Sequence, residues 1–265
     1  MFDALLPAIL LVAGIGLIAG LLLAFASTVM AVPVNEKEVA VRDCLPGANC
    51  GACGFSGCDG YAKAVAAGGV ATNLCRPGGA DAAEKISAIL GVETEKSEPV
   101  VAFVHCGGEC GINNQKEVYE GIRSCAAEKM LYGGKGACTF GCLGCGDCAK
   151  QCQYDAICMV NGIARVNPEK CVGCGMCAKA CPNHIISLVP KTEQAVITCS
   201  NHEKGAVARK ECKNACIGCM KCQKNCSFEA ITVVDNLAVI DYTKCTGCGT
   251  CVDGCPVGCL KIHKI

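Results

Sequence analysis

Four copies of one cysteine spacing, C-x2-C-x2-C-x3-C, constrain the fold of this chain more than any other feature. Each copy places four thiols within eleven residues. Three thiolates that lie within seven residues can bind three corners of one [4Fe-4S] cube, whereas the fourth cannot fold back onto the same cube. The spacing therefore predicts a fold built around iron–sulfur clusters. The runs are Cys142, Cys145, Cys148, Cys152; Cys171, Cys174, Cys177, Cys181; Cys216, Cys219, Cys222, Cys226; and Cys245, Cys248, Cys251, Cys255.

The spacing of these runs resembles that of bacterial ferredoxins, in which the fourth cysteine of each run binds the cluster of the partner run. Runs one and two begin 29 residues apart, as do runs three and four. We therefore expect each pair of runs to hold two clusters with crossed ligands. The expected sets are Cys142, Cys145, Cys148, Cys181; Cys171, Cys174, Cys177, Cys152; Cys216, Cys219, Cys222, Cys255; and Cys245, Cys248, Cys251, Cys226.

Two other uses of cysteine fit the pattern less well. Structural zinc sites usually draw their ligands from separated C-x2-C pairs rather than from triplets. A disulfide framework is typical of small secreted proteins, and the 29 cysteines of this chain are an odd number.

The two cysteine-rich halves form a sequence repeat. Equivalent residues in the two halves are as far apart in the sequence as Cys142 and Cys216 are. Ten cysteines fall on cysteines at that offset, including Cys125 on Cys199 and Cys138 on Cys212. In the first half, Cys106, Cys110, Cys125 and Cys138 form a group that could hold a further cluster. In the second half the positions equivalent to Cys106 and Cys110 are not cysteines, so buried free thiols remain the simpler interpretation of Cys199 and Cys212. Cys44, Cys158 and Cys259 have no assigned role.

An apolar run of 25 residues, Ala8 to Val32, lies near the N-terminus, and no charged residue occurs between Asp3 and Glu36. At 1.5 Å per residue the run spans roughly 37 Å, which is enough to cross a hydrocarbon core of about 30 Å. A cleaved signal peptide would have a basic start and a shorter apolar core. We therefore expect an uncleaved membrane anchor, in which three glycines favour helix–helix packing.

A glycine-rich segment, "LPGANCGACGFSGCDG", follows the anchor and contains the start of a second cysteine pattern, C-x2-C-x4-C-x16-C. This pattern predicts a fifth cluster, with helices over 59–67 and 80–90 beside it. Cys44 could compete as a ligand, but Cys50 belongs to the tight glycine-rich loop. The four predicted ligands are Cys50, Cys53, Cys58 and Cys75.

The composition agrees with a chain organised by clusters. Tryptophan is absent and aromatic residues make up 4%, which is too few for ordinary large cores. Because metal sites couple to folding, we expect the iron-free chain to be largely unfolded. The formal net charge of zero gives no indication of nucleic-acid binding.

These patterns predict an α+β protein with a transmembrane helix, a four-cysteine module and two ferredoxin-like units that each hold two clusters. Five to six [4Fe-4S] clusters are expected. The expected divisions are 1–34 for the anchor, 35–91 for the module, 92–99 for a linker, 100–138 for a cysteine-rich intermediate region, 139–190 for the first ferredoxin-like unit and 191–265 for the second.

The anchor, the "LPGANCGACG" module with its later "CRPGG", and the ferredoxin-type runs together resemble the B subunit of the Rnf complex, an ion-translocating ferredoxin:NAD oxidoreductase. Simpler members carry one ferredoxin pair, whereas this chain resembles the longer versions of anaerobes. The resemblance implies a subunit that accepts electrons from soluble ferredoxin and relays them to membrane and flavin-containing partners, which reduce NAD and move Na⁺ or H⁺. It also implies a bacterial cytoplasmic membrane, with the cluster domains facing the cytoplasm.

The residues themselves support part of this interpretation. Several clusters in one chain are typical of an electron carrier, and the sequence contains no credible nucleotide loop, flavin site or acid–base pair, so we expect no catalytic residues and no direct NAD binding. A membrane-tethered polyferredoxin that serves a hydrogenase or another reductase is the main alternative. A zinc-stabilised scaffold is a third. The sequence leaves the coupling ion, the direction of electron flow and the order of the clusters open.

Overall fold

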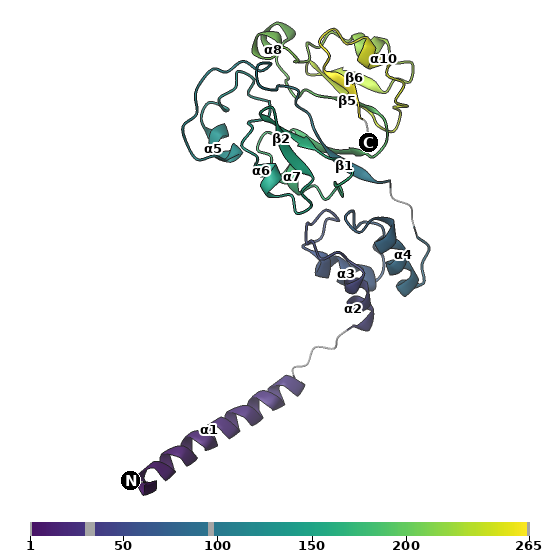
Figure 1. Ribbon diagram of the computed structural model, residues 1–265. Helices are drawn as coiled ribbons and strands as arrows, with labels where there is room; N and C mark the ends of the chain where they lie inside the picture. The colour runs from purple at the N-terminus through teal and green to yellow at the C-terminus, as the bar shows by residue number, and fades with distance from the viewer. Residues whose placement is uncertain (1, 30–34, 95–97, 264–265) are drawn as a thin grey trace.

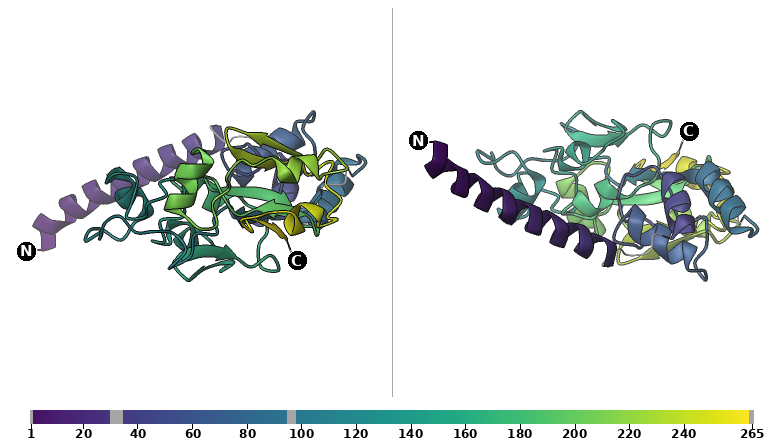
Figure 2. Two further views of the ribbon diagram at one scale, coloured as in Figure 1. Left: turned by 90° about the horizontal axis from the view of Figure 1, so that it is seen from above. Right: turned by 90° about the horizontal axis from the view of Figure 1, so that it is seen from below.

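The computed structural model describes residues 2–29, 35–94 and 98–263. From the N-terminus it contains a long isolated helix, a small helical module, and a larger body that carries the strands (Figure 1). In both views of Figure 2 the first helix is a single straight rod. The expected linker, 92–99, lies partly outside the described residues.

The first helix, α1 (Phe2–Val29), is apolar around its whole circumference. Its stretch from Leu10 to Thr28 is a candidate membrane span, and none of that stretch is buried against the rest of the chain. Large side chains such as Leu17 and Leu23 are 65% and 72% exposed. A helix that is apolar on all sides and free of protein contacts requires an apolar environment, which a bilayer supplies.

The helical module contains α2 (Glu36–Asp43), α3 (Cys58–Ala66) and α4 (Gly79–Leu90), so the two helices predicted beside the fifth cysteine group are confirmed. Tyr61, Val65 and Ile86 are almost completely buried in its core. The Tyr61 hydroxyl donates to the carbonyl of Ala71 over 2.9 Å. Two of the predicted ligands, Cys58 and Cys75, are buried in the same small core.

The first ferredoxin-like unit contains two antiparallel strand pairs. The strand β1 (Val100–Val104) pairs with β4 (Ile186–Pro190), and β2 (Ile157–Val160) forms a hairpin with β3 (Ile163–Val166). Two short helices, α6 (Asp147–Lys150) and α7 (Met176–Ala180), each carry the third cysteine of a run. A further helix, α5 (Cys125–Met130), lies between β1 and the first run.

The second unit repeats this arrangement. The strand β5 (Ala195–Ile197) pairs with β8 (Leu260–Ile262), and β6 (Ile231–Val234) pairs with β7 (Leu237–Ile240). The helices α9 (Lys221–Lys224) and α10 (Thr250–Asp253) correspond to α6 and α7. The helix α8 (Gly205–Glu211) precedes the third run as α5 precedes the first.

The register of the outer strand pairs aligns the two units residue by residue. Ala102 pairs with Leu188, and Ala195 pairs with Ile262. Leu188 and Ile262 are equivalent positions of the sequence repeat, but Ala102 lies farther ahead of its cysteine runs than Ala195 does. The first unit therefore contains a longer connection between its first strand and its first cysteine run. The strand β1 begins the region expected at 100–138, and it pairs with β4 of the first unit.

Candidate iron–sulfur centres

Each cysteine run folds into a tight loop followed by a short helix. Glycines in the left-handed region, such as Gly144 and Gly146 in the first run, let the loop turn around its central cysteine. At Gly173 a Cβ would lie 2.5 Å from the carbonyl oxygen of Val100, so the close approach of the loop to β1 requires glycine. The third cysteine of each run lies on the short helix and is buried: Cys148, Cys177, Cys222 and Cys251.

The second expected group surrounds a cavity of about 320 Å³ in the first unit. Apolar side chains, including Ile157 and Val172, line the rest of its wall. The amide of Ala102 donates to Sγ of Cys171 over 3.4 Å, and that of Ala156 donates to Sγ of Cys152 over 3.4 Å. The cysteines that line this cavity are Cys152, Cys171, Cys174 and Cys177, the expected crossed set.

The third expected group surrounds a similar cavity in the second unit, also of about 320 Å³. An additional thiol, Cys259, lines it, and its Sγ lies 3.6 Å from Sγ of Cys255. The sequence assigned no role to Cys259, and the first unit has Ile185 at the equivalent position of the repeat. The expected cysteines at this cavity are Cys216, Cys219, Cys222 and Cys255.

The fourth expected group also lies together. Burial raises the pKa of Cys251 to about 11, and the neighbouring thiols Cys245, Cys248 and Cys226 contribute to that increase. The amide of Ala230 donates to Sγ of Cys226 over 3.4 Å, as its counterpart does in the first unit. All four crossed ligands are therefore close to one another.

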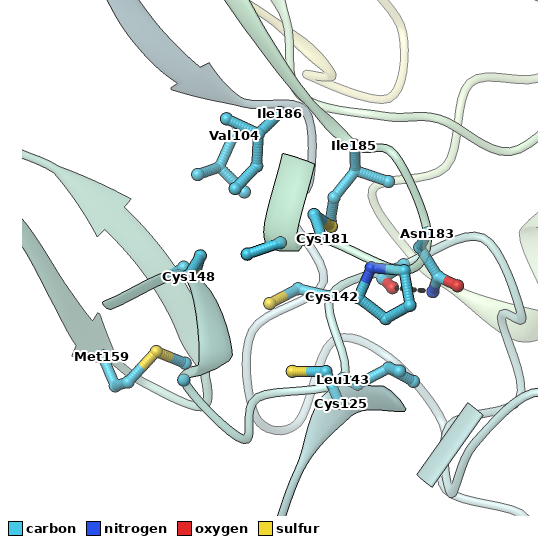
Figure 3. Close-up of a pocket in the computed structure, with 15 residues that line it drawn as sticks. Val104, Cys125, Cys142, Leu143, Cys148, Met159, Cys181, Asn183, Ile185 and Ile186 are labelled. Carbon is cyan, nitrogen blue, oxygen red and sulfur yellow. Dashed lines mark hydrogen bonds between the residues drawn. The ribbon is translucent and has the colours of Figure 1, made fainter. Parts of the chain in front are cut away.

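The first expected group differs at one position. Its cavity, of about 370 Å³, is lined by three of the expected cysteines, Cys142, Cys148 and Cys181. The fourth cysteine in its wall is Cys125, whereas the expected ligand Cys145 does not line it. The sulfurs of Cys125 and Cys142 point into the same space (Figure 3). The Cys145 thiol donates to Oε2 of Glu128 over 2.9 Å. Burial and this hydrogen bond to the carboxylate raise the pKa of Cys145 to about 12.

The four cysteines of the N-terminal module also lie together. Burial raises the pKa of Cys75, and the nearby thiols Cys58, Cys50 and Cys53 raise it further. The side chain of Asn49 accepts a hydrogen bond of 2.8 Å from the amide of Cys58, which holds the loop against the start of α3. By contrast, the thiol of Cys44 donates to the carbonyl of Ala40 on its own helix over 3.3 Å.

The four-thiol group expected at Cys106, Cys110, Cys125 and Cys138 does not form. Cys125 lies at the first cavity, and Cys110 is exposed beside Gly162. The other two line a cavity of about 310 Å³ together with two cysteines of the second unit, Cys199 and Cys212. The sequence offered one signal for this arrangement: both Cys106 and Cys199 follow an apolar strand by two residues.

The geometry of the groups fits iron–sulfur clusters better than single metal ions. All 29 cysteines lie among the described residues, and each is a free thiol. Within the described ranges, no three His, Cys, Asp or Glu side chains converge on one metal position. A tetrahedral zinc ion would need its sulfurs about 2.3 Å from one point. Sulfurs spaced around an apolar cavity, with amide N–H donors beside them, suit a cube.

The cysteine groups lie next to one another. Cys50 of the module is close enough to Cys174 to raise its pKa, after the larger effect of burial. Lys179 on α7 also donates to the carbonyl of Cys50 over 3.1 Å, which joins the module to the first unit. Within that unit, Cys177 is close enough to Cys148 to raise the pKa of Cys148, again after the larger effect of burial.

Three family models match separate parts of the chain. One described as "Putative Fe-S cluster" matches residues 45–77, which include the four cysteines of the module. A "4Fe-4S binding domain" matches residues 164–187, and a "4Fe-4S dicluster domain" matches residues 215–260. These matches show that the chain contains 4Fe-4S-type domains, as the cysteine spacing predicted.

Curated relatives align over nearly the whole chain. A protein of Acetobacterium woodii, named as the B subunit of the Na(+)-translocating ferredoxin:NAD(+) oxidoreductase complex, is 41% identical over 98% of this chain and 79% of its own length. A Clostridium ljungdahlii protein, named as the B subunit of the proton-translocating complex, is 44% identical over 93% of this chain and 88% of its own. A Methanosarcina acetivorans protein, named as the B subunit of the ion-translocating oxidoreductase complex, is 39% identical over 99% of this chain and 100% of its own. The chain therefore belongs to the family of B subunits of the ion-translocating ferredoxin:NAD(+) oxidoreductase (Rnf) complexes.

Proposed function

We propose that this chain is the membrane-anchored electron-transfer subunit of such a complex, accepting electrons from reduced soluble ferredoxin. Other subunits, some of them in the membrane and some carrying flavin, reduce NAD and move Na⁺ or H⁺. The relatives in Acetobacterium woodii and Clostridium ljungdahlii are named for Na(+) and proton translocation, respectively. Both names also give ferredoxin and NAD(+) as the redox partners of the complex.

The observation that carries the proposal is the adjacency of cysteine groups in different parts of the chain: Cys50 of the module lies near Cys174 of the first ferredoxin-like unit. Each bound [4Fe-4S] cluster supplies a one-electron redox centre. The chain's own residues hold these centres close together, exclude water with apolar walls and donate amide hydrogen bonds to the sulfurs. Such hydrogen bonds, with burial, tune reduction potentials.

The arrangement favours one order of the groups. The module follows the candidate membrane span, and its Cys50 contacts the first ferredoxin-like unit through Lys179. The second unit lies on the far side of the first unit from the module (Figure 1). We therefore propose that soluble ferredoxin docks on the cluster-bearing body and that the module delivers electrons near the membrane, with the body on the cytoplasmic face.

The ligand Cys75 provides a test, because it belongs to the module alone. In the anaerobically solubilised complex, we expect Cys75→Ser to abolish ferredoxin-dependent NAD reduction while ferredoxin still bleaches the remaining clusters. Cys44→Ser is the matched control in the same module, because the Cys44 thiol bonds to its own helix. Unchanged NAD reduction in Cys75→Ser would contradict the proposed path. Co-purification of a hydrogenase, without flavin-containing or multi-span subunits, would support a polyferredoxin instead.

A further inference from the structure

We propose that Cys106, Cys138, Cys199 and Cys212 hold an additional [4Fe-4S] cluster at the junction between the two ferredoxin-like units. All four line one cavity of about 310 Å³. The cavities formed by the second and third groups are likewise lined by four of the expected cysteines each. The four residues are between 6% and 9% exposed, so the proposed ligands are shielded from water.

The first pair of ligands occupies equivalent positions in the two units. Cys106 follows β1 and Cys199 follows β5, each by two residues. Sγ of Cys106 accepts from the amide of Gly108 over 3.4 Å and from that of Cys142 over 3.3 Å. Sγ of Cys199 accepts from the amides of Asn201 and Cys216 over the same two distances. Two amide donors on each sulfur are the environment of a cluster thiolate, and they recur here in both units.

The second pair of ligands, Cys138 and Cys212, occupies equivalent positions of the sequence repeat. The two residues are as far apart in the sequence as Cys142 and Cys216 are. The side-chain amide of Asn201 donates to Sγ of Cys138 over 3.4 Å, which crosses from one unit to the other. The four ligands therefore form two equivalent pairs, with one member of each pair in each unit. An approximate two-fold relation of this kind suits a cube, which presents four equivalent iron corners.

Two glycines lie beside the sulfurs and show how close the sulfurs are to one another. A Cβ on Gly108 would lie 3.6 Å from Sγ of Cys106 and 3.6 Å from Sγ of Cys212. A Cβ on Gly141 would lie 3.6 Å from Sγ of Cys106 and 3.8 Å from Sγ of Cys138. Two sulfurs near one such point are separated by at most the sum of these distances, so Cys106 lies near both Cys212 and Cys138.

Hydrogen bonds between the units close the junction around this cavity. Nδ1 of His105 pairs with the carbonyl of Ile197 over 2.7 Å, and the hydroxyl of Ser200 donates to the carbonyl of His105 over 2.9 Å. The side-chain amide of Asn214 donates to the carbonyl of Gly107 over 3.1 Å. The site therefore exists because the two units pack against each other.

The position of the site also connects two groups that would otherwise be separate. Cys142 of the first group donates its amide to Cys106, and Cys216 of the third group donates its amide to Cys199. The four cysteines thus lie between the clusters of the two units. A role in passing electrons between the units rests on the proposed function, whereas the presence of the metal site does not.

Iron and sulfide counts test the site without any activity measurement. For the anaerobically purified full-length chain with its clusters, we expect about 24 iron atoms, against about 20 without this site. Cys138→Ser and Cys212→Ser are each expected to lose about four iron and four sulfide per chain. Cys110→Ser is the matched control, because Cys110 belongs to the same connection but is exposed, and it should lose none.

The outcomes separate the site from the proposed function. A wild-type count of about 20 iron atoms, unchanged iron in both variants, or stoichiometric zinc in place of iron would overturn the site. Because a serine at the junction could disturb folding, the wild-type count and the spectrum of the reduced clusters provide evidence that needs no variant. Failure of ferredoxin-to-NAD transfer with about 24 iron atoms present would count against the function and leave the site standing.

Discussion

At the scale of single residues, the structure raises the question of which cysteine is the fourth ligand of the first group. Cys125 lines that cavity, whereas the Cys145 thiol bonds to buried Glu128. The loop around Cys145 nevertheless has left-handed glycines on both sides, as does the loop around Cys174, which does line its cavity. Rotation of the Cys145 side chain, without movement of the backbone, would turn its sulfur to the cluster.

We therefore expect Cys145→Ser to lose about four iron atoms per chain and Cys125→Ser to keep them. The reason is that the loop geometry of C-x2-C-x2-C orders three sulfurs around one cube. Cys125 lies outside that loop, on α5. Iron and sulfide analysis of the two anaerobically purified variants is the measurement. The reverse result would show that Cys125 replaces Cys145 as a ligand.

At the scale of elements, the strand β1 decides where the first ferredoxin-like unit begins. Val101 on β1 is fully buried and pairs with Val189 on β4. The amide of Ala102 donates to a sulfur of the second group, so β1 contributes directly to a cluster site. The long connection that follows β1 carries Cys110 and α5, and it has no equivalent of the same length in the second unit.

We expect Val101→Asp to remove iron from the first unit, because an unpaired carboxylate buried in a strand pair costs several kcal/mol. Val160→Asp on β2 is the control, since Val160 is 41% exposed and its carboxylate would reach water. Thermal unfolding and iron content of both variants provide the check. A Val101→Asp protein with the iron content and melting temperature of the wild type would show that β1 is dispensable for the unit.

At the scale of the whole molecule, cysteines form part of each of the three hydrophobic cores. Aromatic residues are 4% of the chain, and no tryptophan is present to fill a large core. Several buried thiols have a raised pKa because burial disfavours the thiolate, as at Cys138, where the value is about 12. Cluster binding must therefore displace protons as well as order the loops.

Removal of iron by a chelator under anaerobic conditions is expected to unfold the module and both ferredoxin-like units, while α1 stays helical in detergent. Hydrogen exchange would reveal this as lost protection of β1 and β4 with retained protection of α1. Adding iron and sulfide back should restore the protection of the strands. Full protection of the strands in the iron-free protein would show that apolar packing alone maintains the fold.

From the sequence alone we predicted the four ferredoxin-type groups, the group in the module, the apolar span and the two helices of the module. These features depend on residues close together in the chain or on a known crossing of ligands between paired runs, so spacing is sufficient to predict them. The ligand sets remain predictions that metal analysis tests, and the domain boundaries also remain predictions.

Which of the remaining cysteines line a common cavity depends on the tertiary structure. The sequence repeat aligned Cys199 with Cys125, whereas the register of β1 with β4 and of β5 with β8 makes Cys106 its equivalent. That equivalence depends on strand pairing between distant segments, and the junction cavity depends on how the two units pack. The contacts that create them join residues up to about a hundred positions apart, so cysteine spacing alone did not predict them.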